Sequence, residues 1–307
     1  MGHLNLDSQN RKIMTKTIKL IAIDVDGTLL NNEHQLTERT EKALRAALEK
    51  DIRVILATGK TRRSVEALLA QLNLTDPGIY VQGLTTYAGD GALLTQQVLS
   101  PVIVRQVLTF AEDRGFTVAL YSGARILARK RNPQIDALTI PFHEPPAEEV
   151  GPLQNVLSAV AVNKVVALGD ARRVKSLRWQ LSMQLNGTVR LMQAGVPEMV
   201  EVLPPGGSKG AALKTLLNEL SIPAENVLAI GDAENDIELL KLAGIGVAMG
   251  NASPVVKAAA DYVTASNDED GAAQAIERFV LADEQTEAVE NNVTNPAATT
   301  SPESGEA

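Results

Sequence analysis

Short apolar runs alternate along the chain with stretches in which apolar residues recur every three to four positions. The runs at 18–25, 52–57 and 227–230 consist mainly of Ile, Leu, Val and Ala, which is typical of strands buried on both faces of a parallel sheet. The stretch at 36–48 carries apolar residues at helical spacing with charged residues between them, which is typical of a surface helix, and a further helix is expected at 236–243. This alternation predicts βαβ units and an α/β fold with a mostly parallel sheet.

The pattern changes in the middle of the chain. Alternating residues flank the turn Gly89-Asp90-Gly91 and predict a β-hairpin at 85–99. Residues 130–150 contain four prolines and are expected to form a long loop. The remaining patterns predict an α+β unit with helices near 102–114, 153–160 and 171–185 and strands near 117–121, 125–128, 164–168, 188–192 and 199–202.

These patterns divide the chain into a split core and an insertion. We expect a core domain formed by residues 18–83 and 199–281, with residues 84–198 inserted as a second domain. Residues 1–17 are expected to be a flexible leader. Residues 282–307 contain six acidic and no basic residues and very few apolar ones, so we expect a disordered acidic tail.

Composition excludes several classes of protein. Of the 307 residues, 45% are hydrophobic and 21% charged, as in ordinary globular domains. There is no cysteine, so disulfides, thiolate nucleophiles and cysteine-bound zinc are excluded, and a metal would have to bind to oxygen. An aromatic content of 3% and the lack of a basic stripe argue against a nucleic-acid surface. No apolar run could cross a membrane and no signal peptide is evident, so we expect a cytoplasmic protein, whose oligomeric state the sequence does not indicate.

The densest candidate chemistry follows the first predicted strand. Asp24 and Asp26 stand at its carboxyl end, within Asp24-Val25-Asp26-Gly27-Thr28-Leu29. Ligands of open parallel sheets bind at this edge, and two carboxylates there need a cation to offset their charge. A polar strand exit followed by a glycine turn is the alternative interpretation.

A second acidic group follows the strand at 227–230. It contains Asp232, Asn235 and Asp236 within Gly231-Asp232-Ala233-Glu234-Asn235-Asp236. Two acidic strand ends in one parallel sheet would meet in space and form an oxygen-rich site suited to Mg²⁺. Helix capping alone would also explain Asn235 and Asp236.

Two further positions would complete a phosphoryl site. Thr58-Gly59 follows the second predicted strand, and Lys209 lies in Gly207-Ser208-Lys209-Gly210. A hydroxyl and an ammonium group beside Mg²⁺ suit phosphoryl chemistry, because that chemistry depends on positioning and charge neutralisation. Taken singly, Thr58 could equally be a helix cap and Lys209 a solvated side chain.

In their order along the chain, these segments resemble the four motifs of the haloacid dehalogenase superfamily of phosphohydrolases. The motif residues are Asp24-x-Asp26-Gly27-Thr28, Ala57-Thr58-Gly59, Ser208-Lys209-Gly210 and Gly231-Asp232-x-x-Asn235-Asp236. The large insertion between the second and third motifs is similar to the type IIB cap of the Cof-type branch. The resemblance implies a Rossmann-like doubly wound core with an α+β cap. Lys60 and Gln82-Gly83 depart from the usual Arg and Asn-Gly of that branch.

The resemblance also implies a role for each motif residue. Asp24 would be the nucleophile that forms an aspartyl-phosphate, and Asp26 would be the general acid and base. Mg²⁺ would be held by Asp24, the main-chain carbonyl of Asp26 and Asp232, with Asp236 binding or orienting a metal water. The residues on the phosphate group would be Thr58, Gly59, Lys209 and Asn235.

We therefore predict a Mg²⁺-dependent phosphatase of small phosphorylated metabolites. Sugar phosphates, pyridoxal phosphate and flavin-pathway phosphates are all compatible substrates. A phosphomutase of the same fold would instead return the phosphate to the bound substrate. A non-catalytic phosphometabolite-binding protein is the third alternative, although a degenerate copy should have lost at least one motif carboxylate.

Overall fold

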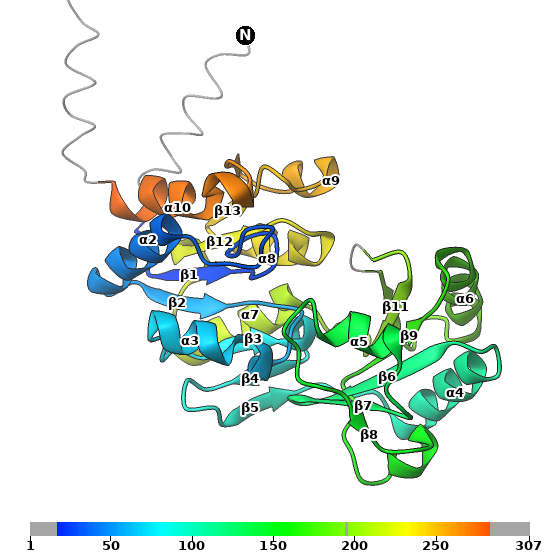
Figure 1. Cartoon of the computed structure of the whole chain (residues 1–307). Coiled ribbons are helices and arrows are strands. Elements are labelled where there is room, and N and C mark those ends of the chain that lie inside the picture. The colour runs from blue at the N-terminus through cyan, green and yellow to red at the C-terminus, as the bar shows by residue number, and fades with distance from the viewer. Residues whose placement is uncertain (1–16, 194–195, 283–307) are drawn as a thin grey trace, which may run out of the picture.

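The computed structural model describes residues 17–193 and 196–282, which form two lobes (Figure 1). The predicted leader at 1–17, apart from Thr17, and the predicted tail after Ala282 lie outside the described residues. The core lobe contains a five-stranded parallel sheet in the order β14-β13-β12-β1-β2. Its strands are β1 (Leu20–Ile23), β2 (Arg53–Leu56), β12 (Val227–Gly231), β13 (Ile245–Ala248) and β14 (Tyr262–Val263).

Helices cover both faces of this sheet. On one face, α2 and α10 pack against Ile21 and Ile23 of β1, and on the other, α7 and α8 pack against Leu20 and Ala22. Successive β1 side chains are thus buried on opposite faces, as a continuous apolar strand requires. The core helices are α2 (Glu38–Glu49), α3 (Glu66–Leu72), α7 (Lys209–Leu220), α8 (Ile237–Leu242), α9 (Pro254–Lys257) and α10 (Gly271–Ile276). The prediction of a doubly wound α/β core is confirmed.

A small antiparallel sheet extends the core lobe. It consists of β3 (Gly78–Tyr80), β4 (Thr85–Tyr87) and β5 (Leu93–Gln96), and the predicted hairpin forms its last two strands. A parallel bridge between Ala57 and Ile79 joins this sheet to the end of β2.

The second lobe is an α+β unit, as the sequence predicts. Its six-stranded sheet has the order β10-β11-β9-β6-β7-β8 and is antiparallel except for the β7–β8 pair. Helices α4 (Pro101–Glu112) and α6 (Ala171–Gln184) cover one face, while α5 (Pro133–Thr139) lies on the other, toward the core. The strands are β6 (Thr117–Ser122), β7 (Arg125–Ala128), β8 (Glu148–Glu149), β9 (Lys164–Leu168), β10 (Arg190–Met192) and β11 (Met199–Leu203). We refer to this lobe as the cap.

The strand pairing bears on where the core ends and the cap begins. Strands β4 and β5 pair with β3 on the core side, although they follow residue 84. Strand β11 pairs with β9 and β10 of the cap, although it follows residue 198. We therefore propose that the cap begins after β5 and ends with β11, slightly later at both ends than the sequence division.

Two local predictions are wrong. The expected long loop at 130–150 contains α5 and β8, because Asn132 caps the helix and Pro133 occupies its first turn. The helix expected at 153–160 is only a 3-10 turn at Leu153–Val156. Its preceding Pro152 makes no side-chain capping hydrogen bond.

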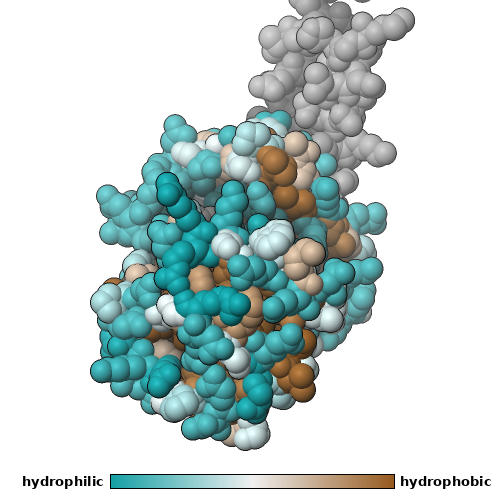
Figure 2. Space-filling model, turned by 90° about the vertical axis from the view of Figure 1, so that its right-hand side faces the viewer, coloured by the Kyte–Doolittle hydropathy of each residue, from teal (hydrophilic) through white to brown (hydrophobic). Residues whose placement is uncertain are grey.

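The surface shown in Figure 2 is mainly hydrophilic, with separate small hydrophobic patches. Within residues 17–193 and 196–282, no helix combines the length and the apolar character that crossing a membrane would demand.

Candidate active site

The candidate residues lie where neighbouring parallel strands of the core sheet end. Strand β1 is paired with β12 and β2, and Ile23 is in register with both Ile230 and Leu56. The residues that follow these three strands therefore meet at one edge, beneath the cap. They line a cavity of about 810 Å³ between the two lobes. Its size is typical of a small-molecule site.

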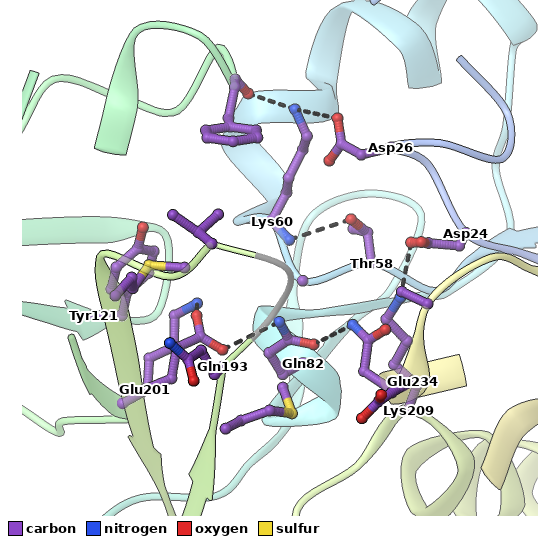
Figure 3. Close-up of a pocket in the computed structure, with 18 of the residues that line it drawn as sticks. Asp24, Asp26, Thr58, Lys60, Gln82, Tyr121, Gln193, Glu201, Lys209 and Glu234 are labelled. Carbon is purple, nitrogen blue, oxygen red and sulfur yellow. Dashed lines mark hydrogen bonds and ion pairs between the residues drawn. The ribbon is translucent and has the colours of Figure 1, made fainter. Parts of the chain in front are cut away.

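Asp24 and Lys209 form the centre of the site. The Lys209 Nζ atom lies 2.8 Å from Asp24 Oδ1 and 2.8 Å from Asp236 Oδ1, and all three residues are buried (Figure 3). Lys209 is the first residue of α7, which begins there because the Ser208 hydroxyl accepts a hydrogen bond from the Ala211 N–H. Lys209 is thus a buried, paired cation rather than a solvated side chain.

Burial and crowding shift the pKa values of these groups. Burial raises the pKa of Asp24 well above its ordinary value, and neighbouring Asp236 and Asp232 raise it further, against the opposing effect of Lys209. Burial and Asp236 also raise the pKa of Asp232, to about 6. Burial alone would lower the pKa of Lys209, but its two carboxylate partners outweigh that effect and raise it. Negative charge at this edge therefore exceeds the positive charge that Lys209 provides.

The carboxylates are arranged as a divalent cation would need them. Asp24, Asp232 and Asp236 each offer an oxygen, and these oxygens lie within 4.8 Å of one another. Hard oxygen ligands with excess negative charge fit Mg²⁺. Asp236 is itself fixed, because its second oxygen accepts hydrogen bonds from the N–H groups of Asp232 and Ala233.

The loop after β1 is shaped around Asp232. The Thr28 hydroxyl donates a hydrogen bond of 3.0 Å to Asp232 Oδ1. Gly27 has a φ of +73°, and a Cβ atom there would lie 2.5 Å from Asp232 Oδ2. Asn251 donates to the Gly27 carbonyl at 2.9 Å, which ties the loop after β13 to the same turn. Glycine is thus required at position 27 by both its conformation and its surroundings.

Thr58 lies buried at the end of β2, and its hydroxyl accepts a hydrogen bond from the Lys60 N–H. Gly59 leaves room for Gln82, because a Cβ atom on Gly59 would lie 2.6 Å from Gln82 Nε2. Both residues line the cavity with Asp24 and Lys209. Their placement is compatible with phosphate binding, which stays a prediction.

Asp26 points away from Asp24, toward the cap (Figure 3). Its Oδ1 lies 3.1 Å from Lys60 Nζ and 3.5 Å from His34 Nδ1. Lys60 also donates a hydrogen bond to the main-chain carbonyl of Phe142, next to α5. A proton shuttle at Asp26 would therefore have to leave its ion pair with Lys60.

The cap side of the cavity contains polar residues that sequence reasoning missed. Lys164 and Glu201 form a buried ion pair at 2.5 Å, and Lys164 lies over the Tyr121 ring. Gln82 connects this pair to Asn235 on the core side. The sequence contained one signal, since Glu201 interrupts the otherwise apolar strand β11, while Lys164 is the first residue of the apolar strand β9.

Comparison with known proteins is consistent with this geometry. A family model described as haloacid dehalogenase-like hydrolase matches residues 21–276. The chain is 32% identical over 269 residues to the 5-amino-6-(5-phospho-D-ribitylamino)uracil phosphatase YcsE of Bacillus subtilis, covering 86% of this chain and 96% of that protein. A solved structure of a HAD subclass IIB sugar phosphatase superimposes with a TM-score of 0.75 and 26% identity, covering 86% of this chain and 100% of that one.

One relative is much longer than this chain. The chloroplastic Endoribonuclease YBEY of Arabidopsis thaliana is 34% identical over 270 residues, which cover 85% of this chain and 46% of the relative. The chain thus spans about half the length of that protein.

Proposed function

This chain belongs to the haloacid dehalogenase-like hydrolases, and we propose that it is a Mg²⁺-dependent phosphatase that acts on small phosphorylated metabolites through Asp24. One observation carries the proposal. A buried nucleophile candidate, its cationic partner Lys209 and two further carboxylates meet at a cavity that is large enough for a metabolite and is lined by Asp24, Lys209 and Asp232.

We assign the metal site to Asp24, Asp232 and Asp236 together with the main-chain carbonyl of Asp26. When bound, Mg²⁺ would supply positive charge for the phosphoryl oxygens. Lys209 would bind the same oxygens and keep Asp24 oriented, while the Thr58 hydroxyl and the Gly59 backbone would receive the phosphate from the opposite side.

The chemical steps follow from two carboxylates with different surroundings. An Asp24 oxygen attacks phosphorus in line, the bond to the leaving oxygen breaks, and an aspartyl-phosphate forms. Asp26 donates its proton to the leaving alcohol. Asp26 then takes a proton from a water molecule, whose oxygen attacks phosphorus, and this releases inorganic phosphate and regenerates Asp24.

The cap would close the cavity over the leaving group and exclude water other than the attacking molecule. The substrate panel should include 5-amino-6-(5-phospho-D-ribitylamino)uracil, because one relative is named for that activity. It should also include sugar phosphates, because a similar structure is a sugar phosphatase, and pyridoxal phosphate.

The test is phosphate release from this panel, with Mg²⁺ and with EDTA, by the wild type and Asp24→Asn. We expect release to require Mg²⁺ and the variant to lose at least ~10⁴-fold in kcat, because the nucleophile is removed. Asp76→Asn, at a partly buried ion pair with Arg53 outside the cavity, is the matched control and should keep full activity. Turnover by Asp24→Asn would refute the nucleophile assignment, and isomerised product without free phosphate would identify a phosphomutase.

A further inference from the structure

Four polar residues form a continuous hydrogen-bonded chain from the cap to the core. Lys164 Nζ lies 2.5 Å from Glu201 Oε1, Gln82 Nε2 donates to Glu201 Oε2 at 3.2 Å, and Asn235 Nδ2 donates to Gln82 Oε1 at 2.8 Å (Figure 3). The first two residues belong to cap strands β9 and β11, and the last two to the core. We call these residues the bridge.

Three of the four bridge residues are buried, and Asn235 is partly buried. Lys164 and Glu201 are only 3% and 2% exposed, and Gln82 only 5%. A buried ion pair contributes little more stability than a well-packed apolar pair would. All four residues line the cavity, so they face the candidate site rather than the interior of a lobe.

The backbone at Gln82 is held in an uncommon conformation. Val81 and Gln82 have φ values of +51° and +63°, in the left-handed region that favours glycine. For a β-branched residue such as Val81 this conformation is costly, and such costs concentrate at functional sites. The result is a Gln82 side chain that fills the space above Gly59 and faces both lobes.

Asn235 depends on Gln82 for its orientation. Among the described residues, the hydrogen bond to Gln82 is the contact recorded for the Asn235 amide, and Asn235 Oδ1 is buried without a hydrogen-bond partner. Asn235 belongs to the loop that also carries Asp232 and Asp236. Whatever moves Gln82 therefore changes how the Asn235 amide faces the phosphate site.

We propose that Gln82 is a positioning residue that couples cap closure to the phosphate site by holding Asn235 only while Glu201 holds Gln82. The proposal rests on the proposed phosphatase function. When the cap opens, Glu201 withdraws and the donor group of Gln82 loses its acceptor. The site would then be complete only when the cap is closed, which suppresses water-driven side reactions in the open state.

Two variants at Gln82 distinguish its hydrogen bond to Asn235 from its hydrogen bond to Glu201. Gln82→Leu removes both hydrogen bonds, whereas Gln82→Glu keeps an acceptor for Asn235 but cannot donate to Glu201. Gln96→Leu is the matched control, because Gln96 is a partly buried glutamine that bonds Asn163 outside the cavity. Each variant is compared in kcat and KM on the best-hydrolysed member of the panel, and its unfolding midpoint is measured.

We expect Gln82→Leu to lower kcat about tenfold, with KM changed less than about threefold, since the lost bonds act on the phosphate end and not on leaving-group affinity. Gln82→Glu should lower kcat to a similar extent, because its carboxylate repels Glu201. Gln96→Leu should match the wild type in both constants. Unchanged kcat in both Gln82 variants, or an effect confined to KM, would overturn the proposal.

A double-mutant cycle tests the coupling itself. The cap pair is replaced by Lys164→Met with Glu201→Leu, which removes the acceptor without leaving a charge unpaired, and this change is combined with Gln82→Leu. Coupling predicts that the cap-pair variant alone loses about tenfold in kcat, and that the combined variant loses no more than about tenfold, like Gln82→Leu alone. Independent roles would instead multiply to about a hundredfold loss, which contradicts the proposal. If the wild type releases phosphate from no panel member, the proposed function fails and not the coupling.

Discussion

The two walls of the cavity carry buried charge in opposite ways. On the core wall, the carboxylates of Asp24, Asp232 and Asp236 share one ammonium group, that of Lys209. On the cap wall, Lys164 and Glu201 neutralise each other in a single pair. The core wall is thus left with uncompensated negative charge, and the cap wall is balanced.

This difference separates the residues that need a ligand from those that do not. Burial, and after it the neighbouring carboxylates, raise the pKa values of Asp24 and Asp232, so these groups resist ionisation. A divalent cation at these carboxylates, as we propose, would relieve that charge. The balanced cap pair needs no ion to offset its charge.

The largest expected effect is a loss of activity when the ammonium group of the core wall is removed. Lys209→Met keeps the side-chain volume but removes the ammonium group, and we expect kcat/KM to fall at least ~10³-fold, because the phosphoryl group loses a buried cationic partner. Phosphate-release kinetics measure this. Lys241→Met, at an exposed position of helix α8, is the control and should be fully active. More than a tenth of wild-type activity in Lys209→Met would show that the charge is dispensable.

Removing the carboxylate of the cap wall should lower the stability of the protein. Glu201→Leu leaves Lys164 buried without a partner, and we expect a loss of about 3 kcal/mol in the free energy of unfolding. The double replacement Lys164→Met with Glu201→Leu should recover most of it, because no charge then remains. Urea unfolding measures both.

An exposed ion pair provides the matched control. Arg125 and Glu148 lie on the cap surface, and Glu148→Gln should change stability by less than about 1 kcal/mol. If Glu201→Leu were as mild as this control, the buried pair would not be needed to satisfy Lys164.

The smallest expected effect is a change with pH in the stability of the metal-free protein. The pKa of Asp232 is raised from 3.8 to about 6, so the folded state binds more protons than the unfolded state between these values. Stability therefore falls as pH rises from about 4 to 6. Asp232→Asn removes this loss, and we expect the variant in EDTA to be more stable than the wild type by about 1–2 kcal/mol at pH 7.5.

The advantage of Asp232→Asn should shrink toward pH 4, where the wild-type carboxyl is protonated. Saturating Mg²⁺ should also reduce it, because the ion stabilises only the wild-type site. Urea titrations over pH in EDTA and in Mg²⁺ measure both trends. An advantage that is independent of pH would point to repacking rather than to the charge.

The contrast between the walls also explains what the sequence could predict. The core residues follow apolar strands that pair as parallel neighbours, so placing the strands places Asp24, Thr58 and Asp232 together. The cap pair joins residues 37 positions apart on antiparallel strands. Glu201 pairs with Val166, and Lys164 lies two residues from Val166 on the same face of β9. No local pattern specifies that register.

Other differences have local causes. Helix α5 was predictable from Asn132 and Pro133, but the prolines around it pointed to a loop. The orientation of Gln82 follows from a left-handed backbone that no residue type at 81 or 82 would suggest. The roles of individual motif residues stay predictions until the variants are measured.

The cap is joined to the core by two chain segments, one after β5 and one between β11 and α7. A body held at two adjacent points keeps a single rotational degree of freedom, about the line that joins them. At the second segment, Gly207 packs so closely on Leu84 that a Cβ atom would lie 2.3 Å from its Cδ2, which holds this axis against the core. If the cap opens as we propose, these two adjacent segments would be its hinge, and the close packing of Gly207 on Leu84 would guide Glu201 back to Gln82 on closure.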